Sequence, residues 1–129
     1  MEPAPEVRDA YLRFIRALSS GDAPSLGGRF SRLPGVIEIG SDPDAWSEGY
    51  ESVTDRLTAV SREIAETNIE TGDVKAFQEG TVAWLADRPT LAPPGGIKVA
   101  ARVTAVFRRE EDGWKVVQSH LSMGRRLTA

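Results

Sequence analysis

The segment VTAVFRREEDGWKVVQSHLSMG, Val103–Gly124, predicts a β-hairpin. Runs of alternating apolar and polar residues flank Glu111–Gly113, and the glycine at its third position favours a three-residue loop closed by a bulge. In this register Thr104 lies opposite His120, and Arg102 lies diagonal to it. The segment therefore indicates a sheet, but it contains no motif that names a reaction.

Helical periodicity is concentrated in the first half of the chain. Apolar residues recur every three or four positions over Pro5–Ser19, and Gly21 follows where a helix-ending glycine is favoured. Asp22 is placed to cap a short second helix. A longer helix is predicted to begin after Ser47 as its cap. The apolar stripe of this longer helix is Tyr50, Val53, Leu57, Val60 and Ile64.

Strand patterns dominate the remainder of the sequence. The predicted strands are Val36–Ile39, Glu66–Thr71, Val74–Gln78, Thr81–Arg88, Ile97–Arg109 and Trp114–Leu121, with a loop at Pro89–Gly96. Helices that precede strands indicate an α+β fold in which the helices cover one face of an antiparallel sheet. A chain of 129 residues suits a single domain spanning residues 1–129.

Composition limits the classes of partner. The chain has 16 Lys and Arg against 19 Asp and Glu, so it lacks the basic balance expected of nucleic-acid binders. It has no cysteine, which excludes disulfides and thiolate sites and is typical of a reducing compartment. We see no signal peptide and no apolar run long enough for a bilayer. We therefore expect a soluble cytoplasmic protein without nucleic-acid or membrane partners.

Five motifs, taken together, carry a family resemblance. They are FIRALSSGD at Phe14–Asp22, WSEGY at Trp46–Tyr50, GTVAW at Gly80–Trp84, the pair Arg102 and Thr104, and the set Trp114, His120 and Ser122. In order and spacing these motifs resemble the SnoaL-like branch of the nuclear transport factor 2-like superfamily. That superfamily includes ketosteroid isomerases, polyketide cyclases and the association domain of calmodulin-dependent kinases. The resemblance implies a cone-shaped, curved antiparallel sheet wrapped around N-terminal helices, a cystatin-like α+β roll. It also implies a pocket at the open end and a homodimer built through the sheet.

The chemistry of ketosteroid isomerases is not expected to carry over. In the resemblance, their oxyanion-stabilising tyrosine falls on Phe14 and their carboxylic-acid donor on Ala105. Their general base falls near Ile39 or Gly40, where a shifted alignment would supply Glu38. Without these groups, proton transfer next to a carbonyl loses the side chains that lower its barrier. Whether the chain is an enzyme stays open, and the catalytic candidates are Glu38 and His120.

One face of the hairpin predicts an apolar pocket. Two pocket arginines of the kinase association domain fall on Ala105 and Leu121, so an anion-binding site is not expected. Strand alternation places Val99, Ala101, Val103, Ala105 and Phe107 on one face, joined by Val117 and Leu121. The predicted ligand-binding residues are Tyr11, Phe14, Trp46, Tyr50, Val103, Ala105, Phe107 and Leu121. The alternative, that these side chains simply fill the core, stays open.

The opposite face of the hairpin predicts a homodimer interface. A mixture of tryptophan, arginine, histidine and small polar residues suits an interface better than an active site. The predicted interface residues are Trp84, Arg102, Thr104, Trp114, Gln118, His120 and Ser122, and Val116 shares their face. A β-bulge within the hairpin would reverse this assignment.

No metal or cofactor site is predicted, because one histidine and scattered carboxylates give no ligand spacing. The acidic residues Asp42, Asp44 and Glu48 fit the favourable field at the start of the long helix. Three classes of function remain. The first is a protein that binds a small apolar molecule, which is our main expectation. The others are an isomerase, cyclase or hydrolase acting on an apolar substrate, and a homodimeric protein-interaction module.

Overall fold

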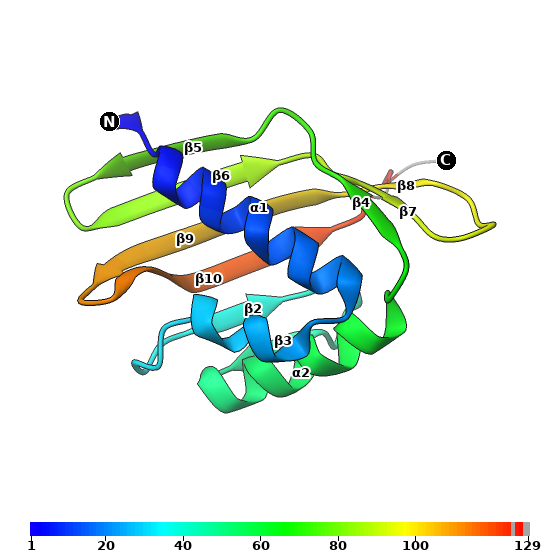
Figure 1. The fold of residues 1–129 in the computed structure, drawn as a ribbon, viewed down its shortest axis with the longest axis horizontal. Helices are drawn as coiled ribbons and strands as arrows, with labels where there is room; N and C mark the ends of the chain where they lie inside the picture. The colour runs from blue at the N-terminus through cyan, green and yellow to red at the C-terminus, as the bar shows by residue number, and fades with distance from the viewer. Residues whose placement is uncertain (125, 128–129) are drawn as a thin grey trace.

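The computed structural model describes residues 1–124, 126 and 127, and a large curved sheet crossed by a helix dominates it (Figure 1). The helices are α1 (Pro5–Ser20) and α2 (Tyr50–Glu63), with short 3₁₀ turns η1 (Ala23–Ser25) and η2 (Gly27–Arg29). The strands are β1 (Glu2–Pro3), β2 (Ile37–Ile39), β3 (Trp46–Glu48), β4 (Asn68–Glu70), β5 (Lys75–Glu79), β6 (Val82–Asp87), β7 (Thr90–Ala92), β8 (Val99–Ala100), β9 (Arg102–Glu110) and β10 (Gly113–Ser122). The predicted α+β fold is confirmed.

The larger sheet has the strand order β1-β5-β6-β9-β10-β2-β3. Neighbouring strands of this sheet run antiparallel, except for β10 and β2, which are parallel to each other. A smaller antiparallel sheet, β4-β7-β8, lies at one end (Figure 1). None of the helices in the described residues combines the length and the apolar character needed to cross a bilayer.

Helix α1 begins and ends where the sequence predicts. Pro5 occupies the first turn, where its missing N–H costs nothing. Gly21 ends the helix in the left-handed conformation with φ 74°. The apolar stripe Val7, Tyr11, Ile15 and Leu18 is buried against the sheet and α2. Because these signals are local, the sequence alone was enough to place this helix.

Ser47 was predicted as a helix cap, and that prediction is wrong. Ser47 lies in β3, paired with Glu38 of β2. The N–H of Gly49 donates to the carbonyl oxygen of Val36 at 2.8 Å, which extends the pairing, and α2 starts one residue later. Strand pairing with a distant segment therefore competes successfully with a local cap. Asp22 likewise caps no backbone group and precedes a 3₁₀ turn instead of an α-helix.

The predicted loop Pro89–Gly96 contains a strand, because β7 pairs with both β4 and β8. The predicted strand Ile97–Arg109 is interrupted at Ala101, whose N–H donates to the carbonyl oxygen of Pro89 at 2.9 Å. This bond ties the two sheets together at the point where the chain passes from one to the other.

The hairpin of β9 and β10 contains its bulge in mid-strand. The predicted opposition of Thr104 and His120 is present. Nearer the turn, however, Trp114 pairs with Arg109 and Val116 with Phe107, so the register shifts by one residue before Gln118. The extra residue is Val117. It reverses the faces of Trp114 and Val116, which point to the interior, contrary to prediction.

Candidate functional site

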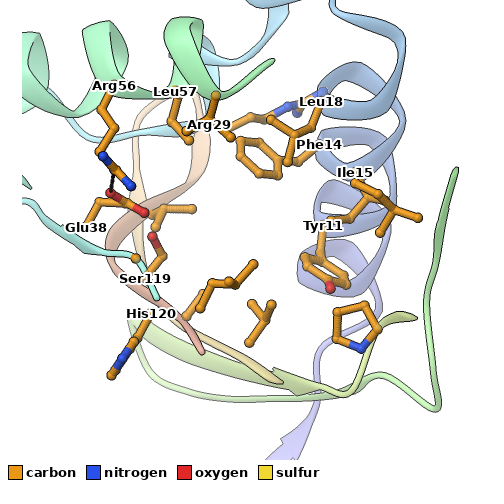
Figure 2. Close-up of a pocket in the computed structure, with 18 of the residues that line it drawn as sticks. Tyr11, Phe14, Ile15, Leu18, Arg29, Glu38, Arg56, Leu57, Ser119 and His120 are labelled. Carbon is orange, nitrogen blue, oxygen red and sulfur yellow. Dashed lines mark ion pairs between the residues drawn. The ribbon is translucent and has the colours of Figure 1, made fainter. Parts of the chain in front are cut away.

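A cavity of about 270 Å³ lies between α1, α2 and the inner face of the large sheet (Figure 2). Its walls are mainly apolar and include Phe14, Ile15, Leu57, Ala105 and Phe107. The volume is close to the lower end of the roughly 300–1,000 Å³ found for small-molecule sites. The cavity therefore has room for a small organic molecule.

Six of the eight predicted ligand-binding residues line this cavity. They are Tyr11, Phe14, Val103, Ala105, Phe107 and Leu121. The other two lie elsewhere. Trp46 is 58% exposed on β3, and its indole N–H donates to Glu48. The ring of Tyr50 lies beneath the guanidinium of Arg32 at 4.2 Å. Both aromatic residues flank the β3–α2 junction, whose position the sequence misplaced. Ligand binding by the other six stays a prediction.

Glu38 lies at the cavity because its position on β2 faces the inner side of the large sheet. Ala105, Ser119, Glu38 and Ser47 are opposite one another across β9, β10, β2 and β3. Side chains in one row share a face, so Glu38 follows Ala105 and Ser119 to the inside. Its side chain is only 12% exposed. The shifted alignment considered from the sequence thus corresponds to a carboxylate in the cavity wall.

Arg56 of α2 forms an ion pair with Glu38, with Nε 3.4 Å from Oε2 (Figure 2). A Cβ on Gly40 would come within 2.9 Å of Nη2 of Arg56, so the glycine leaves room for the guanidinium. Arg56 lies beside the apolar stripe of α2 and was not among the residues predicted from the sequence. Its role depends on a strand that is distant in sequence, and no local pattern reports it.

The electrostatics of Glu38 are dominated by burial. Burial raises the pKa of this carboxyl, and the nearby charges of Arg56 and His120 oppose that rise only in part. A carboxyl with a raised pKa keeps its proton to a higher pH than a free one, and carboxyls of this kind are common among general acids and bases. His120 contributes charge from the edge of the site, and its side chain points away from the cavity centre (Figure 2).

Tyr11 lies on the opposite side of the cavity from Glu38 (Figure 2). Its hydroxyl donates to Oδ2 of Asp87 at 2.7 Å. The other oxygen of Asp87 accepts the backbone N–H groups of Gly72 and Arg88 at 2.9 and 2.8 Å. Burial and this carboxylate raise the pKa of Tyr11, so the phenol stays neutral. Because its proton is committed to Asp87, Tyr11 offers the cavity a ring and no free donor.

Trp114 was predicted to lie in the dimer interface, and that prediction is wrong because Trp114 lines the cavity. Arg109 covers its ring at 4.5 Å. Its indole Nε1 is buried without a hydrogen-bond partner in the described part of the chain. The bulge at Val117 explains the difference, and the two adjacent valines at 116 and 117 were its signal in the sequence.

The other predicted interface residues do lie on the outer face of the sheet. Across β6, β9 and β10, Trp84 is opposite Val106, which in turn pairs with Gln118. The next rows pair Thr104 with His120 and Arg102 with Ser122. Val106 and Phe77 extend this surface and were missed from the sequence. Contact with a second copy stays a prediction.

Metal binding has no support in the described residues, where no three His, Asp or Glu side chains gather into a set that could hold an ion. The cavity wall also contains polar and charged side chains, set among the apolar ones: Glu38, Arg56, Arg29, Ser41, Asp42, Glu63, Ser119, His120 and the indole of Trp114.

Comparison with solved structures supports the fold. A protein of unknown function from Pseudomonas putida, described as nuclear transport factor 2-like, matches with a TM-score of 0.86 and 16% identity over 96% of this chain and 88% of that one. A protein from Streptomyces avermitilis, provisionally described as a dehydratase of the same family, gives a TM-score of 0.82 and 21% identity over 93% and 94%. A protein of unknown function with a cystatin-like fold from Nostoc punctiforme gives 0.80 and 14% over 99% and 98%.

No curated protein matches the sequence. One sequence family does match, and it is described as a SnoaL-like domain. Because this family matches residues 7–126, nearly the whole sequence, the chain belongs to the SnoaL-like domain family, as the resemblance implied.

Proposed function

We propose that the protein binds a small, mainly apolar molecule in the cavity between α1, α2 and the inner face of the sheet. The observation that carries this proposal is the cavity itself, about 270 Å³ in volume and lined largely by aliphatic and aromatic side chains. A core that only stabilises the fold is normally packed with few voids larger than a water molecule.

The location of the protein in the cytoplasm stays a prediction.

The test is to fill the cavity with one side chain. Ala105 is buried on β9 and faces the cavity, so Ala105→Leu should occupy part of its volume. Ala59 is exposed on α2, so Ala59→Leu makes the same chemical change away from the cavity. We expect a neutral fluorescent probe, 1-N-phenylnaphthylamine, to bind the wild type and Ala59→Leu equally and Ala105→Leu at least about tenfold more weakly. Equal binding by all three folded proteins would contradict the proposal.

A second candidate is an enzyme that moves a proton on an apolar substrate, and the buried carboxyl of Glu38 favours it. The corresponding test uses a small apolar ketone, 2-tetralone, in deuterated water. A catalytic Glu38 should speed the exchange of hydrogen next to the carbonyl, and Glu38→Gln should lose this effect while it still binds the ketone. Exchange at the buffer rate in the wild type would remove this candidate.

We also propose a homodimer formed through the outer face of β6, β9 and β10. Val82 of this surface is 44% exposed, and Trp84, Val106 and Phe77 lie beside it in the sheet. Solvent-facing aromatic and aliphatic groups rimmed by polar side chains are typical of protein interfaces. Sedimentation equilibrium would test this part of the proposal, because a monomer at high micromolar concentration would contradict it.

A further inference from the structure

The buried polar side-chain atoms that lack a hydrogen bond in the described residues all belong to residues that line one cavity. In residues 1–124, 126 and 127, the buried side-chain nitrogen and oxygen atoms without a hydrogen-bond partner are Oε2 of Glu38, Nε of Arg56 and Nε1 of Trp114. Each of these residues lines the cavity described above. Buried polar groups in proteins are nearly always paired, so each exception needs an explanation.

From these positions we infer that the ligand is a neutral alcohol with an apolar body and a second, acceptor oxygen. This inference depends on the proposed function, because it names the class of molecule that the cavity takes. The hydroxyl group lies between Glu38 and Arg56, and the acceptor oxygen lies at Trp114.

The ion pair between Glu38 and Arg56 favours a ligand with a hydroxyl group. Nε of Arg56 and Oε2 of Glu38 are 3.4 Å apart, longer than the roughly 2.7–2.9 Å of a charge-assisted hydrogen bond. Nε can only donate and an ionised carboxylate can only accept. A hydroxyl group does both, so it donates to Glu38 and accepts from Arg56 at the same time. A carboxylate ligand would meet the charge of Glu38, and an amine would meet that of Arg56.

Trp114 selects a different group. Its indole nitrogen is a donor only, so it pairs with a carbonyl, ether or hydroxyl oxygen and with no cation. Arg109 holds the ring from one side at 4.5 Å. Trp114 is five residues from Ser119 on β10, and Ser119 is the neighbour of Glu38 in the sheet. The two polar positions therefore lie at different places along the cavity, and the apolar walls contact the part of the ligand between them.

The first experiment compares probes that share one carbon skeleton. Calorimetry at pH 7 would measure the binding of tetralin, 2-tetralol, 2-aminotetralin and tetralin-2-carboxylate to the purified protein. We expect 2-tetralol to bind on the order of tenfold more tightly than tetralin, and both charged probes to bind more weakly than 2-tetralol. Equal affinity for tetralin and 2-tetralol would show that the ion pair holds water only, and would overturn the inference while the proposed function stands. If no probe binds, the proposed function fails as well.

Matched variants locate the two contacts. Arg56→Gln should remove the advantage of 2-tetralol over tetralin, whereas Arg62→Gln, on an exposed position of the same helix, should keep it. Trp114→Phe keeps a ring but no donor, so it should remove the gain that a 6-methoxy group adds to 2-tetralol. Trp84→Phe on the outer face is the control and should retain that gain. If Trp114→Phe also retains the gain, the acceptor position is wrong; if Arg56→Gln keeps the preference for the alcohol, the hydroxyl position is wrong.

Discussion

Glu38 places a carboxyl group inside an otherwise apolar cavity, and that position has a consequence for stability. Burial raises its pKa in the folded state above the ordinary 4.5. Between these two values the folded protein binds more protons than the unfolded chain, so the free energy of unfolding falls as pH rises. The contribution of Glu38 is fully present below about pH 4.5 and is lost as pH rises through the folded pKa.

Glu38→Gln should remove this pH dependence, because an amide does not ionise. We expect the free energy of unfolding of the variant, minus that of the wild type, to rise from pH 4 to pH 8. Urea denaturation at several pH values would measure this difference. Glu111→Gln, in the exposed hairpin turn, is the control. A difference for Glu38→Gln that stays flat or falls with pH would show that the carboxyl is not buried as described.

Tyr11→Phe should destabilise the protein by about 1–3 kcal/mol, because it leaves Oδ2 of the buried Asp87 without its donor. The ring that lines the cavity remains, so probe binding should change little. Tyr50→Phe, at a half-buried ring outside the cavity, should cost less. Urea unfolding of the three proteins at pH 7 would compare them. Equal stability of both variants would argue against the Tyr11–Asp87 bond.

In the β9–β10 hairpin, the strands were predicted correctly from the sequence but the position of the bulge was not. Alternation gave the strands, and the pairing of Thr104 with His120 was predicted correctly. The extra residue was expected at the turn, but it lies at Val117. Because strand side chains alternate, one inserted residue moves all side chains on one side of it to the other face. That shift moved Trp114 from the predicted interface to the cavity wall.

Deletion of Val117 should leave the side chains of β10 on their present faces. Val116 pairs with Phe107 and Gln118 with the adjacent Val106, so removal of the extra residue between them gives a regular ladder. We expect this variant to fold with a loss of at most about 1–2 kcal/mol of stability. Deletion of Val106, in the middle of β9, should instead cost more than about 3 kcal/mol or prevent folding, because it turns one half of that strand to the wrong face. Similar melting temperatures for the two deletions would contradict the position assigned to the bulge.

Local sequence signals predicted the ends of α1 correctly but the start of α2 wrongly. Pro5 and Gly21 act within one turn, and the structure confirms the helix that they bound. Ser47 had an equally good local signal for a helix cap, but pairing of its segment with β2 prevailed. The Glu38–Arg56 pair joins a strand to a helix that is distant in sequence. Such contacts depend on the tertiary fold, and a single sequence carries no pattern for them.

In the whole molecule, the two faces of the large sheet have separate proposed roles. The inner face holds the cavity, and the outer face carries His120 beside Thr104 and near Trp84. His120→Ala should weaken dimerisation more than it weakens probe binding, because the side chain is exposed and points away from the cavity centre. Sedimentation equilibrium and probe titration of the same preparation would compare the two effects. An undisturbed dimer that has lost probe binding would place His120 in the ligand site.

The most direct test of ligand binding in the cavity is a titration of ¹⁵N-labelled protein with 2-tetralol, followed by backbone amide chemical shifts. The proposal predicts that the largest saturable changes occur at the cavity wall, including Ala105, Ser119 and Leu57. Residues of the outer face, such as Trp84 and Val106, should change little. Changes concentrated on the outer face, or no saturable change at millimolar probe, would contradict it.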